Sequence, residues 1–270
     1  MEKDKIYLDD CIERMKKFDK ESIDLIFADP PFNIGIKYDN YNDNRPYEEY
    51  YNWSKKWISE TKRILKQNGS IYIAIGDEFA AEINLILKGL GYYFRNWIIW
   101  YYTFGQNQKK KFNRTHTHIF YFTKHPNNFK FNDDSIRIPS ARQLKYNDKR
   151  ANPKGKIPDD VWKFSRVCGN FKERIGNHPC QMPEAILERI IKVSSEEGDL
   201  VLDPFGGTGT TAAVAKKLNR HYLSIEISQE YYETIVKRLN GKLKNQSNSS
   251  KRQSLDLNDQ INFFKQINKS

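Results

Sequence analysis

The sequence lacks the features of a membrane-spanning, exported or disulfide-stabilised protein. No apolar run approaches the roughly 20 residues needed to cross a bilayer, and residues 1–5 are charged and lack the apolar stretch of a signal peptide. The three cysteines, Cys11, Cys168 and Cys180, are scattered and odd in number, which indicates neither a disulfide framework nor a cysteine metal site. We therefore expect a cytoplasmic protein with no membrane contact and no metal.

Acidic residues are also few relative to basic ones. The 270 residues include 45 Lys and Arg but 34 Asp and Glu, which gives a formal net charge of +11. This excess predicts an anionic partner, either nucleic acid or another acidic surface. Hydrophobic residues make up 38% of the chain and aromatic residues 14%, enough for the core of one α/β domain or two small ones.

Segments with the pattern of strands alternate with segments that have the pattern of helices. Strands are expected at 6–8, 22–28, 70–75, 97–102, 118–123, 200–202 and 222–225, and helices at 10–15, 50–65, 79–90, 183–191, 210–218 and 229–239. Such alternation is typical of a parallel, doubly wound sheet. Between about 126 and 177 the periodicity fades and basic residues outnumber acidic ones, and from 245 the sequence is polar.

The expected strand 22–28 ends in Asp29-Pro30-Pro31-Phe32. The prolines fix the turn and remove backbone donors, which leaves their carbonyls free to accept hydrogen bonds. A carboxylate, a rigid corner and an aromatic ring suit a planar ligand ring that carries an exocyclic amino group. Taken alone, the Asp-Pro pair is also compatible with a simple turn from strand to loop.

A glycine-rich turn follows the expected strand 200–202. Its residues are Asp203-Pro204-Phe205-Gly206-Gly207-Thr208-Gly209-Thr210. Glycines allow the backbone to approach a ligand closely, and the next helix offers free N–H groups. Glu226, at the end of the following strand, can accept hydrogen bonds from both hydroxyls of a ribose. The glycine spacing also matches a dinucleotide fingerprint, so a nicotinamide dehydrogenase is an alternative, whereas a P-loop is excluded because no Gly-Lys-Ser/Thr follows. The acid Asp203 favours a ligand with a cationic amino-acid end, such as S-adenosylmethionine.

The two motifs together resemble the signatures of the DNA amino-methyltransferases, and their order along the chain resembles the β group of that family. Residues 57–75 resemble the family's "W…LK..G.IYI" segment, 178–183 its "HPTQKP" motif and 6–11 its "GDC" element. The resemblance covers roughly residues 5–241. It implies a Rossmann-like, circularly permuted, mostly parallel seven-stranded sheet. Residues 1–125 would form the catalytic half, 126–177 an inserted target-recognition segment, 178–244 the cofactor half and 245–270 a polar tail.

The resemblance implies a methyltransferase that uses S-adenosylmethionine to methylate the N6 amino group of adenine in double-stranded DNA. Asp29 and the Pro30 carbonyl, supported by Pro31, would accept the two amino N–H bonds, and Phe32 would stack on the flipped base. Transfer would be a direct in-line displacement, with residues 33–47 as a lid. The predicted cofactor-binding residues are Asp10, Cys11, Asp29, His178, Gln181, Asp203, Pro204, Phe205, Gly207, Thr208, Gly209, Thr210 and Glu226. Phe32 stands where Tyr is commoner, and Cys180 and Met182 replace the usual Thr and Lys of "HPTQKP".

Basic side chains are expected to bind DNA, mostly through phosphates and in a few cases through base edges. The candidates are Lys109, Lys110, Lys111, Arg137, Arg142, Lys145, Lys149, Arg150, Lys154, Lys163, Arg166, Lys172 and Arg174. The family resemblance also allows a cognate restriction endonuclease as partner, and a homodimer.

Besides the nicotinamide dehydrogenase, four alternatives stay open at this point. Methylation of the cytosine N4 amino group is chemically the same reaction, although N4 enzymes more often carry Ser where Asp29 stands. A cytosine-C5 enzyme would need Cys180 as its nucleophile, but that cysteine precedes a helix instead of following a strand. An RNA methyltransferase and a catalytically silent DNA-binding protein complete the set.

Overall fold

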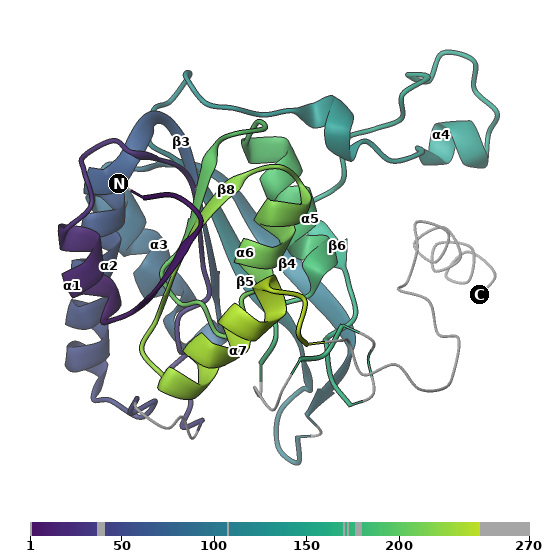
Figure 1. Ribbon diagram of the computed structural model, residues 1–270. Helices are drawn as coiled ribbons and strands as arrows, with labels where there is room; N and C mark the ends of the chain where they lie inside the picture. The colour runs from purple at the N-terminus through teal and green to yellow at the C-terminus, as the bar shows by residue number, and fades with distance from the viewer. Residues whose placement is uncertain are drawn as a thin grey trace.

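The computed structural model describes residues 2–36, 41–106, 108–169, 171, 173–175 and 180–243. These residues form an eight-stranded sheet with the order β1-β8-β7-β2-β3-β5-β4-β6 (Figure 1). The strands are β1 Lys5–Leu8, β2 Ile23–Ala28, β3 Leu65–Ile75, β4 Tyr93–Gln106, β5 Arg114–Thr123, β6 Val161–Lys163, β7 Leu200–Asp203 and β8 His221–Glu226. Within the described sheet only β5 runs antiparallel to its neighbours.

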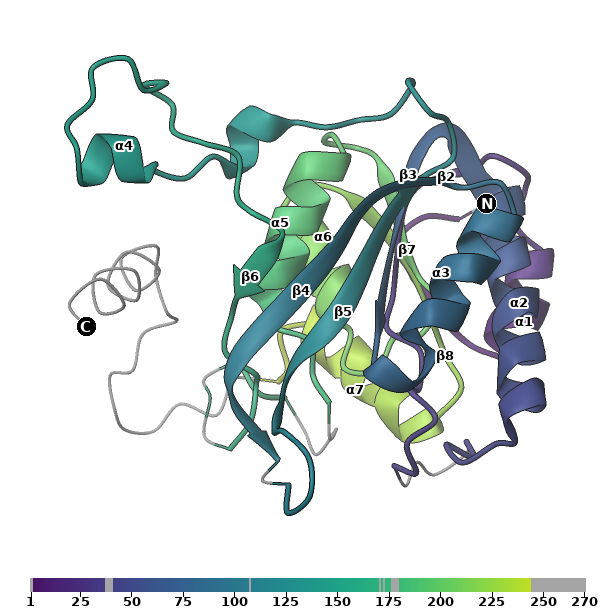
Figure 2. The same cartoon turned by 180° about the vertical axis from the view of Figure 1, so that it is seen from behind.

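Helices cover both faces of this sheet, as the doubly wound prediction requires (Figures 1 and 2). They are α1 Cys11–Lys16, α2 Tyr47–Ile64, α3 Ala80–Gly89, α4 Ala141–Leu144, α5 Glu184–Ser194, α6 Thr210–Lys217 and α7 Gln229–Leu239, with 3-10 turns at Asp77–Phe79 and Asp133–Ile136. Alternate residues of each strand enter different cores: in β3, Ile71 and Ile73 pack with α1–α3, whereas Tyr72 and Ala74 pack with α5 and α6. No helix among the described residues is long and apolar enough to cross a membrane.

The predicted number of seven strands is wrong, because a short eighth strand, β6, comes from the irregular segment 126–177. Its residues pair in parallel with Ile99–Tyr101 of β4. Of its three side chains only Trp162 is buried, with the Arg189 guanidinium 5.0 Å from the ring centroid. One buried residue leaves no alternating pattern by which a sequence could reveal a strand.

The expected end of the helix 50–65 agrees with the structure to within one residue. Helix α2 ends at Ile64, and Leu65 already adopts an extended conformation and pairs with Ile23. Gly69 therefore lies inside β3, where an added Cβ would be 2.6 Å from the Leu65 side chain and 2.9 Å from the Asp24 carbonyl oxygen. Close strand packing, and not a helix end, requires this glycine.

The segment 126–177 divides into two parts that lie at opposite ends of the sheet. After β5 the chain emerges at the amino ends of the parallel strands, and the lobe that carries α4 projects from that end (Figures 1 and 2). Strand β6 runs parallel to β4 and so returns the chain to the carboxyl ends. Within the segment 126–177, only the residues after β6 therefore approach the edge of the sheet where the two motifs lie.

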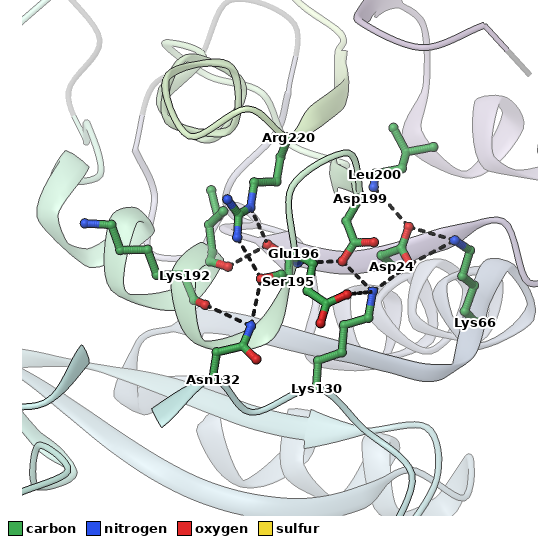
Figure 3. Close-up of polar contacts among 11 residues, drawn as sticks. Asp24, Lys66, Lys130, Asn132, Lys192, Ser195, Glu196, Asp199, Leu200 and Arg220 are labelled. Carbon is green, nitrogen blue, oxygen red and sulfur yellow. Dashed lines mark hydrogen bonds and ion pairs between the residues drawn. The ribbon is translucent and has the colours of Figure 1, made fainter. Parts of the chain in front are cut away.

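An ionic network fastens the start of this segment to the amino ends of the strands (Figure 3). Asp24, 4% exposed, accepts hydrogen bonds from Lys66 Nζ at 2.8 Å and from the Leu200 N–H at 3.0 Å, and pairs with Lys130 at 3.5 Å. Lys130 also pairs with Asp199 at 2.5 Å. These contacts join the chain after β5 to β2, β3 and the loop before β7.

Candidate functional site

The two predicted motifs meet at the carboxyl edge of the sheet, around one cavity of about 820 Å³. Parallel strands present their carboxyl ends at one edge, so the residues that follow β1, β2, β7 and β8 converge there. Most of the predicted catalytic and cofactor residues line the cavity: Asp10, Cys11, Asp29, Pro30, Pro31, Phe32, Gln181, Asp203, Pro204, Phe205, Gly207, Thr208, Thr210 and Glu226. The structure therefore places both motifs in one site. His178 lies outside the described residues.

Gly209 is the exception among the described cofactor candidates, because it lies behind the cavity wall. It has a left-handed conformation, with φ of 73°, at the start of α6. An added Cβ would lie 2.6 Å from Ile235 Cγ2 of α7. This glycine lets the turn pack on α7, and the neighbouring Gly207 and Thr208 face the cavity.

Two buried carboxylates are held rigidly at the ends of β7 and β8. Asp203 accepts hydrogen bonds from the Phe205 N–H at 3.0 Å and from Thr211 Oγ1 at 2.5 Å, and Glu226 accepts from the N–H groups of Gly207 and Ser228, each at 2.8 Å. Burial raises the pKa of Asp203 to about 7, with a further contribution from the Glu226 charge, and burial also raises the pKa of Glu226. Both acids would therefore gain from a ligand that brings positive charge or hydroxyl donors.

Asp10 and Gln181 line the cavity, but much of their hydrogen bonding stays within the protein. Asp10 Oδ1 caps α1 by accepting from the N–H groups of Ile12 and Glu13 at 2.8 and 3.1 Å. Gln181 accepts from the Ile175 N–H at 2.9 Å and donates to the Glu173 carbonyl at 2.5 Å. Gln181 thus holds the wall after β6, and Asp10 caps α1 beside the cavity.

The Asp29–Phe32 corner presents acceptors and a ring. No described residue donates a hydrogen bond to the partly buried Asp29 carboxylate or to the Pro30 carbonyl, whereas the Pro31 carbonyl accepts from the Tyr50 hydroxyl at 2.6 Å. Burial raises the pKa of Asp29 to about 8, and the Asp203 charge acts in the same direction. Phe32 packs over Gly76, where an added Cβ would be 3.1 Å from the ring.

Asp43 supports this corner and was not anticipated from the sequence. It is 2% exposed, and its carboxylate accepts from the N–H groups of Asn33, Ile34 and Ile36 at 2.8, 3.2 and 2.9 Å. The predicted lid is thus anchored at residues 33–36, while 37–40 lie outside the described residues. The loop is rich in Asn and Asp, so no sequence signal distinguishes Asp43 from its neighbours.

Trp53 is a second residue of the site that was not predicted from the sequence. It projects from α2 and lines the cavity, with its ring 5.8 Å from that of Phe205 and 5.7 Å from that of Tyr41. Its helical spacing from Trp57 is that of an ordinary core residue, and only the packing of α2 against the glycine-rich turn exposes its ring to the site.

A cluster of Asp77, His116 and His118 at the cavity mouth has the geometry of a possible cation site. However, Trp97 Nε1 donates to His118 Nδ1 at 2.9 Å, which leaves the proton on His118 Nε2, 2.9 Å from Asp77 Oδ1. Arg114 Nε also pairs with Asp77 at 2.9 Å. The donor set favours a hydrogen-bond network over a bound metal, and the network joins β5 to the turn after β3.

The predicted DNA-binding residues fall into two groups. Lys111 and Arg166 line the cavity, and Lys163, Arg174 and the exposed Lys109 and Lys110 lie near the same edge of the sheet. The other described candidates lie on the lobe at the opposite end: Arg137, Arg142, Lys145, Lys149, Arg150 and Lys154. Within that lobe Arg137 pairs with Asp133 and Asp134, and Arg142 and Arg150 pair with Asp148. Lys172 lies outside the described residues.

Cys180 is unsuited to the role of a nucleophile. Burial raises the pKa of its thiol to about 11, and the charge of Asp29 adds to the shift. A cytosine-C5 enzyme needs a thiolate near neutral pH. The raised pKa of the thiol thus argues against that alternative.

Comparisons with known proteins match this chain to DNA methyltransferases. A family model described as DNA methylase, for N6 and N4 enzymes, matches residues 23–237. The Type II methyltransferase M.HpaI of Haemophilus parainfluenzae is 44% identical over 230 residues, which cover 85% of this chain and 72% of that protein. The DNA adenine methyltransferase YhdJ of Escherichia coli K12 is 38% identical over 238 residues, covering 85% and 80%. The structure of the PvuII DNA methyltransferase (cytosine-N4-specific) superposes with a TM-score of 0.69 at 21% identity, covering 92% of this chain and 89% of that one.

Proposed function

The chain belongs to the N6 and N4 DNA methylase family and is an S-adenosylmethionine-dependent DNA methyltransferase, and we propose that its target is the N6 amino group of adenine. The observation that carries the proposal is a pair of acceptors beside the Phe32 ring, the Asp29 carboxylate and the Pro30 carbonyl, to which no residue in the described part of the chain donates a hydrogen bond. An amino-purine offers two N–H donors and a flat ring to such a corner. A relative at 38% identity is named as a DNA adenine methyltransferase, which supports the choice of base.

The residues of the cavity fit S-adenosylmethionine. Asp203 and Glu226 are buried acids whose raised pKa values would fall beside a cation, and Gly207 and Thr208 allow close approach to the glycine-rich turn. When bound, the cofactor supplies a methyl group activated by its sulfonium charge. The cavity of about 820 Å³ lies within the size range of small-molecule sites.

Asp29 and Pro30 act on the substrate nitrogen. The amino lone pair is delocalised into the ring, so the nitrogen is a poor nucleophile until its N–H bonds are drawn out of conjugation. The Asp29 carboxylate and the Pro30 carbonyl would each accept one N–H, which aligns the lone pair for direct displacement. After transfer the nitrogen carries one proton too many, and Asp29 is the nearest base that can receive it.

Phe32 would hold the target base outside the duplex. Reaching a base requires its extrusion from the stack, at a cost of a few kcal/mol. Stacking on an aromatic side chain returns about 1–3 kcal/mol per base. Gly76 leaves room for the Phe32 ring at the cavity wall.

Cytosine N4 is the second candidate, because the same two acceptors would serve its amino group. Nucleoside mass spectrometry after incubation with S-adenosylmethionine and unmethylated bacterial DNA separates the two. We expect N6-methyldeoxyadenosine. N4-methyldeoxycytidine would reassign the base while keeping the role of Asp29, and the absence of any methylated deoxynucleoside would overturn the proposal and favour RNA or a silent DNA-binding protein.

Further proposals concern organisation and partners. We propose that residues 1–125 form the catalytic half and 178–244 the cofactor half, with 126–177 inserted between them. A cognate restriction endonuclease is proposed because relatives are named as Type II methyltransferases. A homodimer is proposed because Tyr93, Phe94 and Trp97 leave partly exposed rings on β4. Sedimentation analysis of the purified protein tests the dimer.

A further inference from the structure

The tip of the β4–β5 hairpin carries a phenylalanine that the fold leaves in solvent. Phe112 is 99% exposed, and it lies between the ends of two strands that pair out to Gln106 and Arg114. Asn113 Oδ1 accepts from the Gln108 N–H at 2.9 Å, which closes the tip. Figure 2 shows the hairpin extending beyond the body of the sheet, away from the lobe that carries α4. A tip that is closed in this way holds the aromatic ring away from the protein core.

This tip stands at the mouth of the methyltransferase cavity. Gln108, Lys111 and Arg114 line that cavity, so the hairpin forms one of its walls. Arg114 pairs with Asp77 at 2.9 Å and with Glu78, and Glu78 lies beside Gly76, against which Phe32 packs. The hairpin is thus fastened to the wall of the pocket proposed for the target base.

The charge around Phe112 is of one sign and is not neutralised locally. Lys109, Lys110 and Lys111 are exposed, and among the described residues none of them has a carboxylate within 4 Å. By contrast, Arg137 and Arg150 on the α4 lobe are paired with acids of the same lobe. Unpaired lysines on an exposed tip are suited to DNA phosphates.

We propose that Phe112 inserts into the DNA base stack at the position that the target base vacates. The proposal rests on the proposed function, since it requires a flipped base. A single exposed apolar residue is ordinary, but this one combines full exposure, three flanking cations and a place at the cavity mouth. Proteins that distort DNA insert apolar side chains between base steps, and an aromatic ring stacks on any base. Phe32 would then hold the extruded base, and Phe112 would fill the gap it leaves.

The test compares two duplexes that differ in the cost of flipping. Sequencing of DNA modified by the wild-type protein provides the recognised site, and one oligonucleotide duplex carries that site intact. The second places an abasic site opposite the target base, which is then already unpaired. Transfer of tritium from labelled S-adenosylmethionine gives kcat/KM on each. The variants are Phe112→Ala and Phe112→Trp, with Leu85→Ala as the control, because Leu85 is an exposed apolar residue of α3 that does not line the cavity and lies outside the segment 126–177.

F112A should lower kcat/KM on the intact duplex by about 5- to 150-fold, the equivalent of removing one aromatic–base stack, and change it far less on the abasic duplex. F112W should restore most of the activity, and L85A should match the wild type on both. An equal reduction on both duplexes, or no reduction on the intact one, would overturn the inference while the methyltransferase proposal stands. A wild-type protein that methylates no DNA would instead overturn the proposed function.

Discussion

Replacing Asp29 with Asn should abolish most activity and at the same time stabilise the protein. The pKa of Asp29 is raised to about 8 from its ordinary value of 3.8, and no described residue donates a hydrogen bond to its carboxylate. A raised carboxyl pKa means that the favourable contribution is complete below about pH 4 and disappears as the pH rises through 8. Asp29 therefore lowers the stability of the folded protein at neutral and higher pH, because folding requires this carboxyl group either to take up a proton or to bury its charge.

The size of this destabilisation follows from the two pKa values. At 1.36 kcal/mol per pH unit between 3.8 and 7, it reaches at most about 4 kcal/mol. Water in the cavity screens part of it, so D29N should gain about 1–3 kcal/mol at pH 7–8, or roughly 2–10 °C in melting temperature. The gain should shrink toward pH 4, because the carboxyl group is then increasingly protonated in the unfolded chain as well as in the folded protein.

The same substitution removes the charged acceptor for the substrate amino group. Removal of one preorganised electrostatic interaction in an active site typically costs about 10²–10³ in rate, so kcat of D29N should fall by that factor. Binding of S-adenosylmethionine should remain measurable, since Asp203 and Glu226 still line the cavity.

Melting curves by circular dichroism at pH 5 and pH 8, tritium transfer to DNA and cofactor calorimetry together test the reasoning. Turnover within about threefold of the wild type would refute the role of Asp29. A melting temperature that falls, or that rises equally at both pH values, would refute the assigned burial cost.

Three other predictions follow from the structure. Affinity for S-adenosylmethionine should increase from pH 6 to pH 8, by up to about tenfold per pH unit for each proton released, because the pKa of Asp203, about 7, would fall beside the bound cation. Calorimetry should show a weaker dependence of affinity on pH in D203N than in the wild type. The same pH dependence in both proteins would contradict this prediction. Replacing Lys109, Lys110 and Lys111 with alanine should make DNA binding less sensitive to salt. The slope of the logarithm of the DNA association constant against log salt should fall by about 0.9 for each phosphate that the variant no longer neutralises. Fluorescence anisotropy measures this slope, and an unchanged slope would exclude DNA binding by the hairpin tip. Asp24→Ala should destabilise the protein by about 2–4 kcal/mol in urea unfolding, because Lys66 and the Leu200 N–H would lose this acceptor and Lys130 would keep only its other acidic partners, among them Asp199. Activity per folded molecule should persist, since Asp24 lies at the edge of the sheet opposite the cavity.

The cofactor motif and the catalytic corner could be located from the sequence because their signals are local. A buried strand followed by Asp29-Pro30-Pro31-Phe32 needs only the residues themselves to define a rigid turn. Similarly, Gly207 and Gly209 have positive φ values, which their residue type permits at little cost. The alternation of strands and helices then places both motifs at the same edge of a parallel sheet.

The position of the basic segment 126–177 in the fold could not be predicted from the sequence. Composition marked residues 126–177 as one block, but three residues of β6 split it between the two ends of the sheet. A strand of that length is stabilised by the exposed edge of β4, a partner more than 50 residues away in sequence, and so leaves little local pattern. The DNA role of Arg137, Arg142, Lys145 and Arg150 consequently stays a prediction.

By itself, the sequence determined the fold class, the family, the two motifs and the excess of positive charge, because each depends on residue type and on spacing within a few turns of chain. Only the tertiary structure decided which charges are neutralised, which side chains reach the cavity and what supports the catalytic corner. Asp43, Trp53 and Phe112 have no distinguishing local pattern. Their environments are created by elements that meet only when the sheet has formed, and burial, pKa and exposure are properties of those environments and not of the residues alone.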